Sequence, residues 1–266
     1  MDFNTELANF RKGLILRNKI NSNYNSNSVI DEIIIKKSIS LGYDDAKRTF
    51  KGIGKSTSNA KNNAFDNLKI NILNYFSSSA PSSWGDYCKY HEKWCDDFIN
   101  DLRPYAATCG QAQKIINMTM KYIYCLSSDK RNHFKYCHMA LDSYILAWYN
   151  KQKIGKKTNT AWSTLDITEY KKIQNNIYQY LSGDSPKYFK RMFGKNKLST
   201  EALQLDKEPI KAEFVIWACE INFNKLKDAY DTINEIENKS IDISLLTNDD
   251  THTFLMALFD LLQTSV

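Results

Sequence analysis

Lys114 and Asp142 carry the two side chains needed to cut a glycosidic bond through an imine. A deprotonated lysine amine can add to the C1′ carbon of a deoxyribose. A carboxylate near that sugar stabilises the positive charge that develops as the base leaves. Burial or a nearby cation lowers the pKa of a lysine enough for this reaction. The two residues therefore predict base removal followed by strand nicking, with Lys114 as nucleophile and Asp142 as electrostatic stabiliser.

The order of residues around Lys114 is typical of a helix that begins shortly before it. The run Gly110-Gln111-Ala112-Gln113-Lys114 leads into an apolar stretch, and Lys121 follows Lys114 after almost two helical turns. We place Lys114 in the first turn, where the helix dipole disfavours a charged amine. Lys121 shares its face, with Asn117 between them, and is expected to contact a phosphate or to lower the pKa of Lys114. Asp142 is expected to open a second helix.

This arrangement resembles the active-site half of the helix-hairpin-helix DNA glycosylases over roughly residues 105–150. In that superfamily a glycine-rich hairpin leads into the helix of the nucleophilic lysine, and a later segment carries the catalytic aspartate. Gly110 and Ala112 stand where the hairpin glycines would lie, and Lys114 and Asp142 stand where the lysine and the aspartate would. The pair Gln113-Lys114, followed by Lys121, is similar to the pattern of the archaeal 8-oxoguanine DNA glycosylases.

The resemblance implies an all-α fold of two subdomains with a catalytic cleft between them. Residues from about 84 to 150 would form one subdomain, and residues 1–83 and 151–266 would form the other. It also implies a monomeric enzyme that excises a modified base from DNA without a cofactor. The subgroup suggests 8-oxoguanine, while a phage-type modified cytosine, which would make this an antiviral defence enzyme, stays open.

A glycosylase must take its base out of the duplex, so aromatic side chains should line a base pocket. Trp84, beside a serine-rich loop, and Trp217, in a helix after Pro209, are the preferred candidates. Gln113, Asn117 and Lys121 are expected to contact the substrate as well. The phosphate backbone would be held by Gly110 and by basic residues, which are Lys130, Arg131, Lys135, Lys153, Lys156 and Lys157.

Apolar residues recur at spacings of three and four along most of the chain, which predicts an all-α protein. Alternating strand patterns are nearly absent. The expected helices cover residues 28–41, 58–76, 84–102, 108–126, 141–150, 167–181, 209–223, 224–238 and 251–263.

Composition supports a folded protein that can bind nucleic acid. The chain has 266 residues, of which 42% are hydrophobic, and a net charge of +6 that is compatible with binding a phosphate backbone. No apolar run reaches the roughly 18 residues of a membrane span, and no secretory signal opens the sequence. The six cysteines are scattered, so we expect reduced thiols and a cytoplasmic protein.

Two other functions remain open. Arg131 and His138 resemble the Arg-x(4–6)-His element of the helical HEPN ribonucleases, in which an arginine and a histidine cleave RNA. The chain would then be a ribonuclease. The third hypothesis is a helical nucleic-acid-binding protein without chemistry.

Two groups of soft ligands have spacings that could suit zinc, namely Cys88, His91 and Cys95 on one helix face and His133, Cys137 and His138 in a loop. Neither group contains paired Cys-x-x-Cys knuckles. Ordinary buried thiols and surface histidines explain both groups, so we expect no metal.

Overall fold

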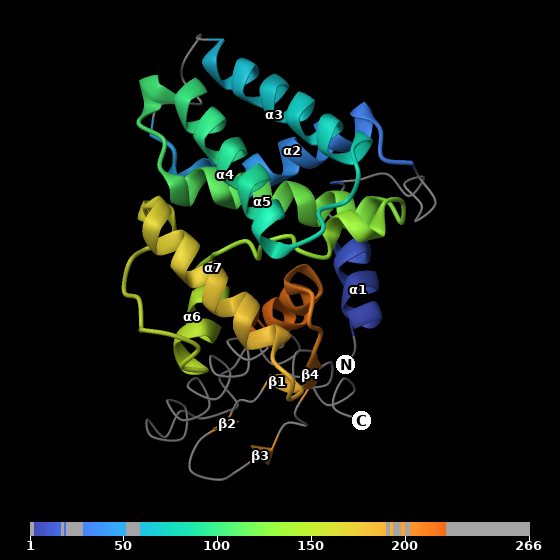
Figure 1. Cartoon of the computed structure of the whole chain (residues 1–266), viewed down its shortest axis with the longest axis vertical. Coiled ribbons are helices and arrows are strands. Elements are labelled where there is room, and N and C mark those ends of the chain that lie inside the picture. The colour runs from blue at the N-terminus through green and yellow to red at the C-terminus, as the bar shows by residue number, and fades with distance from the viewer. Residues whose placement is uncertain are drawn as a thin grey trace, which may run out of the picture. The chain divides into compact units, whose positions relative to one another are not determined.

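A computed structural model of the chain describes residues 3–16, 19, 29–51, 59–189, 192–193, 198–199 and 203–221. Within these ranges the protein is helical apart from two short strand pairs, which confirms the all-α prediction (Figure 1). The expected helices over 224–238 and 251–263 lie outside the described residues. The chain divides into two compact units, Met1–Ala218 and Cys219–Val266.

The α-helices are α1 (Phe3–Leu16), α2 (Glu32–Ala46), α3 (Ala60–Ser77), α4 (Trp84–Asp101), α5 (Cys109–Leu126), α6 (Ser143–Lys151) and α7 (Ile167–Ser182), and a further helix covers residues 209–221. Most of the α-helices begin and end within two residues of the predicted ranges, whereas α2 is shifted by four to five residues and α1 was not among the predicted helices. Short 3-10 turns are η1 (Lys47–Thr49), η2 (Arg103–Tyr105), η3 (Arg131–Phe134) and η4 (Trp162–Thr164). Strand β1 (Lys187–Phe189) pairs antiparallel with β4 (Leu203–Leu205), and β2 (Met192–Phe193) pairs antiparallel with β3 (Leu198–Ser199).

Helix α5 is the centre of the fold, because all of its residues are buried. Its most extensive packing is against α2, and it also contacts α1, α4 and α7. Figure 1 shows α2, α3 and α4 on one side of α5, with α6 and α7 on the other. A helix that is buried all round needs apolar side chains or polar ones with internal partners. The polar residues of α5 have such partners, and they define the candidate site.

Both ends of α5 are capped by side chains. Thr108 and Gln111 form a capping box at its first turn. At the last turn, the guanidinium of Arg11 donates to the carbonyl of Cys125, and Arg131 donates to the carbonyl of Tyr124. A buried helix leaves its terminal amides and carbonyls without water, so these contacts allow α5 to end inside the protein.

One hydrophobic core joins the two subdomains that the sequence suggested. Ile39 and Leu68 from the first 83 residues, Ile115 from the segment 84–150 and Phe214 from the later part all belong to it. All four residues belong to the compact unit Met1–Ala218.

Gly110 has a packing role at the start of α5. Its amide donates to the carbonyl of Leu165 at 3.0 Å, and the residue is buried. A Cβ atom at this position would lie 2.0 Å from the carbonyl oxygen of Trp162. The amide of Gly110, which is expected to contact a DNA phosphate, is thus already bonded within the protein next to η4.

We predict that Gly110→Ala lowers the free energy of unfolding by about 1–3 kcal/mol, since backbone must move to admit the methyl group. Gly13→Ala in α1 is the control, because a Cβ there would meet nothing within 4 Å. It should stabilise the protein by about 0.5–1 kcal/mol through helix propensity. Thermal unfolding measures both. Equal melting temperatures for Gly110→Ala and wild type would contradict the close approach of η4.

Candidate functional site

The structure brings Lys114 and Asp142 into direct contact. The Nζ atom of Lys114 lies 2.8 Å from Oδ2 of Asp142. The other carboxylate oxygen, Oδ1, accepts the backbone amides of Tyr144 and Ile145, each at 3.0 Å, so Asp142 is the N-cap of α6. The aspartate therefore caps a helix and pairs with the lysine at the same time. Lys114 is the sixth residue of α5 and so lies in its second turn, not in the first as expected.

The pair is buried but retains an edge at the surface. The side chains of Lys114 and Asp142 are 7% and 13% exposed. Burial raises the pKa of Asp142, but the positive charge of Lys114, its hydrogen bond and the Ile145 amide together lower that pKa below the ordinary 3.8. Asp142 is therefore a carboxylate at neutral pH.

Lys121 forms a second ion pair on the same face of α5. Its Nζ atom lies 2.8 Å from Oε1 of Glu213, and both side chains are 1% exposed. Three aromatic rings surround the ammonium group, with centroids at 4.6 Å (Phe214), 5.1 Å (Phe10) and 5.4 Å (Trp217). The expected face shared with Lys114 is present, but a phosphate could reach Lys121 only if this pair opened.

Gln113 and Asn117 hold the chain segment that leads to Asp142. This segment, residues 137–142, has no regular secondary structure and is called the strap below. Gln113 accepts the amide of Leu141 at 3.2 Å through Oε1 and donates to the Leu141 carbonyl at 3.0 Å through Nε2. Asn117 donates to the carbonyl of Met139 at 3.0 Å. We had expected both amides to contact substrate, but their atoms are engaged inside the protein.

Trp84 and Trp217 lie at different edges of the site. Trp84 stacks on Tyr178 with ring centroids 4.2 Å apart, and its Nε1 donates to Asn175 at 2.7 Å. Trp217 is half-buried and meets the ring of Tyr144 edge-on at 6.3 Å. Tyr144 follows Asp142 by two residues, so its ring connects Trp217 to the beginning of α6, where Asp142 pairs with Lys114. Our sequence analysis did not single out Tyr144.

The candidate phosphate-binding residues differ in their availability. The Arg131 guanidinium stacks on the ring of Tyr124 at 3.8 Å and donates to the carbonyl of the same residue at 2.9 Å, so it caps α5. Exposed lysines remain available for DNA, and they are Lys130, Lys135, Lys153, Lys156 and Lys157.

A buried cluster of polar aromatic groups lies beside the strap. The hydroxyl of Tyr170 lies 2.7 Å from Nδ1 of His138 and 3.1 Å from Nε2 of His91. The other nitrogen of His138 lies 3.5 Å from Sγ of Cys88. Arg131 and His138 thus have different partners, whereas the ribonuclease hypothesis needs both to act on one phosphate. Among the residues that the structure describes, no group of three or more potential ligands could hold a metal ion.

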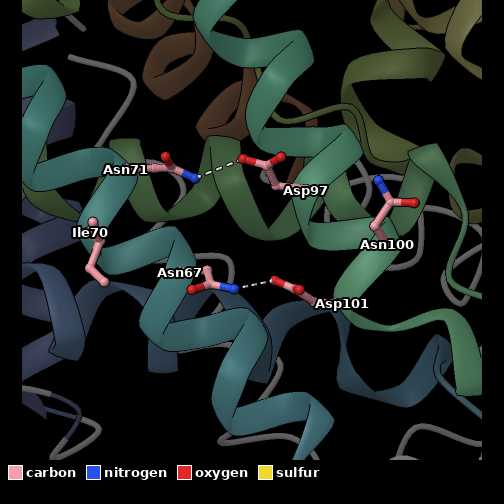
Figure 2. Close-up of a pocket in the computed structure, with 6 residues that line it drawn as sticks. All are labelled: Asn67, Ile70, Asn71, Asp97, Asn100 and Asp101. Atoms are coloured by element: carbon pink, nitrogen blue, oxygen red, sulfur yellow. Dashed lines mark hydrogen bonds between the residues drawn. The ribbon is translucent and has the colours of Figure 1, made fainter.

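Figure 2 shows a polar groove of about 300 Å³ elsewhere, between α3 and α4. Hydrogen bonds cross it from Asn67 to Asp101 at 2.9 Å and from Asn71 to Asp97 at 3.1 Å. Neither Lys114 nor Asp142 lines this groove, and its side chains already pair with one another, so it adds nothing to the chemistry of the ion pair.

One carboxylate of the site, Glu213, was missed by the sequence analysis. Its signal is a single acidic residue inside the apolar run from Ile210 to Ile216. An acid at such a position needs an internal partner.

Searches with protein-family models, among curated proteins and among solved structures found no significant match to this chain. None of the helices within the described ranges has the length and apolar character to cross a bilayer.

The histidine cluster generates a prediction about stability and pH. Burial lowers the pKa of His91 from 6.5 to about 4, although its hydrogen bond with Asn117 opposes the shift. Burial and the neighbouring His91 also lower the pKa of His138. Unfolded histidines take up protons near their ordinary pKa while these two stay neutral, so stability is present above pH 6.5 and is lost as the pH falls toward about 4. His91 alone accounts for about 3 kcal/mol over the whole window.

Thermal unfolding at about pH 7.5 and about pH 5 tests this dependence. The melting temperature of wild type should be lower at the acidic pH. The difference should shrink in His91→Gln and shrink further when His138→Gln is added. A wild-type melting temperature that is the same at both values would show that the two imidazoles are not buried as neutral groups.

Proposed function

We propose that this protein is a DNA glycosylase with lyase activity, in which Lys114 is the nucleophile and Asp142 is its partner. The contact between Lys114 Nζ and Asp142 Oδ2 carries the proposal. Lysine and carboxylate are the two groups that imine chemistry at a deoxyribose requires, and they meet although 27 residues separate them in the chain. The resemblance to the helix-hairpin-helix DNA glycosylases, including a fold of that type, forms part of the same proposal.

The geometry suits the first proton transfer. A lysine must lose a proton before it attacks carbon, and a base must lie within hydrogen-bond reach of that proton. Asp142 Oδ2 meets this condition, while Oδ1 is held by α6 amides that keep the carboxylate oriented. The amine then forms a bond to C1′ as the bond from C1′ to the base breaks. The base leaves with the bonding electrons and takes up the proton that Asp142 accepted from Lys114, which returns Asp142 to its carboxylate form.

A carboxylate beside the sugar also stabilises the positive charge of the transition state. The lowered pKa of Asp142 favours the ionised form that this role needs. Once the base has left, the C1′–O4′ bond of the sugar opens to give an imine between Lys114 and C1′, and O4′ takes up a proton. Loss of a proton from C2′ of this imine expels the 3′ phosphate, so the same lysine accounts for strand nicking. Nothing in this pair would activate a 2′-hydroxyl, which makes DNA and not RNA the expected substrate.

A second buried ion pair, Lys121 and Glu213, has similar chemistry. Comparison with it favours Lys114 and Asp142 as the reacting pair. The second pair has the same chemical groups at the same distance, but its side chains are 1% exposed and an aromatic cage encloses the ammonium group. Of these two buried pairs, Lys114 and Asp142 keep an edge at the surface, with side chains 7% and 13% exposed, whereas Lys121 and Glu213 do not. That edge lies next to Ser143, the exposed first residue of α6.

We predict that borohydride traps wild-type protein on a duplex oligonucleotide with a single abasic site. This probe presents the deoxyribose aldehyde directly, so the test needs no knowledge of the excised base. Lys114→Met should abolish the adduct, and peptide mapping of the wild-type adduct should locate it on Lys114. Lys36→Met is the control, because Lys36 is exposed on α2 and is not among the candidate DNA-binding residues. An adduct that persists in Lys114→Met would remove Lys114 from the proposal.

Asp142→Asn should reduce the rate of trapping by about a hundredfold, the scale of losing one key electrostatic group, while DNA binding changes little. Asp166→Asn is a matched control. Asp166 caps α7 by accepting the amide of Glu169, and its carboxylate makes no ion pair with the residues that the structure describes. If the two variants lose the same small amount of activity, Asp142 is a helix cap alone.

The excised base is identified with a panel of duplexes that contain 8-oxoguanine, glucosylated hydroxymethylcytosine or other modified bases, treated with and without alkali. Single-stranded RNA is offered beside them. We expect abasic sites in one of the duplexes and intact RNA. Metal-independent cleavage of the RNA that survives Lys114→Met but not His138→Ala would instead establish the ribonuclease hypothesis. DNA binding without any product would leave a non-catalytic binding protein.

A further inference from the structure

The strap, which ends at Asp142, has no regular secondary structure, so no helical or sheet hydrogen bonds hold it in place. Its backbone polar groups are bonded by side chains from three helices. Asn117 of α5 and Gln174 of α7 both donate to the carbonyl of Met139, at 3.0 Å and 2.7 Å. Gln113 of α5 binds both backbone groups of Leu141. The remaining anchor comes from the 209–221 helix.

Glu213 provides that anchor and uses both of its carboxylate oxygens. Oε2 accepts the backbone amide of Ala140 at 2.9 Å, and Oε1 accepts Lys121 Nζ at 2.8 Å. Ala140 is fully buried, two residues before Asp142. Glu213 therefore connects the strap to α5 seven residues beyond Lys114, on the face of α5 that carries both lysines. Helix α5 therefore contacts the strap at both lysines. Lys114 pairs with Asp142 directly, and Lys121 pairs with Glu213, which binds Ala140.

We propose that Glu213 is a positioning residue, which sets the place of the Asp142 carboxylate relative to Lys114 through its bond to the Ala140 amide. This inference rests on the proposed function for its consequence in catalysis. The physical reason is that a buried amide must have an acceptor. Without Glu213, the strap must shift until the Ala140 amide finds another acceptor, and Asp142 shifts with it. Lys121 serves as the counterion that allows Glu213 to be ionised in an apolar place.

Removing Glu213 alone would leave the Lys121 ammonium buried without a counterion, which strongly destabilises a folded protein. Two double variants avoid this difficulty. Lys121→Met with Glu213→Gln removes both charges and keeps an oxygen that can accept the Ala140 amide. Lys121→Met with Glu213→Leu removes both charges and the acceptor. The two proteins differ at a single side chain of similar size, so their comparison isolates the bond to Ala140.

Single-turnover trapping on the abasic duplex measures the effect on chemistry. The variant with Gln should react within about threefold of wild type. The variant with Leu should react roughly 10- to 100-fold more slowly, because small misplacements of reacting groups have effects of that size. Affinity for the duplex, measured by fluorescence anisotropy, should be the same for both. A merely structural role of Glu213 would change melting temperature and affinity together and would leave no such split.

Two measurements test the positioning without any reference to DNA. Hydrogen exchange of the segment 137–146 should be faster in the variant with Leu than in the variant with Gln. Labelling of Lys114 by a small amine reagent, followed by mass spectrometry, should also be faster in the variant with Leu, because Asp142 no longer covers the amine. Equal exchange and equal labelling in the two variants would overturn the proposal. If wild type forms no adduct with the abasic duplex, the proposed function fails, and exchange and labelling alone decide whether Glu213 positions Asp142.

Discussion

The complete burial of α5 is the constraint on which the rest of this structure depends. A helix with no exposed residue cannot leave polar side chains to water, and α5 carries Gln113, Lys114, Asn117 and Lys121 on one face. Each of these side chains is satisfied by the strap or by a group that holds the strap. The same hydrogen bonds therefore satisfy the polar side chains of α5 and fix the position of Asp142.

The two ion pairs on α5 have similar chemistry but different roles. Burying a lysine and a carboxylate together costs desolvation that their attraction only partly offsets, so a buried pair is weak evidence for stability. The pair of Lys121 and Glu213 is better explained by the arrangement it imposes, since Glu213 also binds Ala140. The pair of Lys114 and Asp142 keeps an exposed edge, which suits a group that must meet a substrate.

Preorganisation follows from the same network. The Asp142 carboxylate is oriented by two amides of α6, and the strap before it is held by side chains from α5, α7 and the 209–221 helix. Reacting groups that are fixed by contacts from several elements keep their relative positions when a substrate binds. At the beginning of α6, the ring of Tyr144 lies two residues after Asp142 and meets the ring of Trp217, so aromatic surface follows the pair along the chain.

The sequence by itself determined the helical class, most helix boundaries and the two residues of the candidate pair. These depend on local periodicity, on capping residues such as Thr108 and Asp142, and on a lysine near the beginning of an apolar helix. Only the tertiary structure decided that Lys121 faces Glu213 and that Gln113 binds the strap instead of a substrate. Helical spacing gives the face on which a side chain lies, but what covers that face is set by segments far away in the chain. Glu213 lies 92 residues beyond Lys121, and no local pattern connects a residue with a partner at that distance.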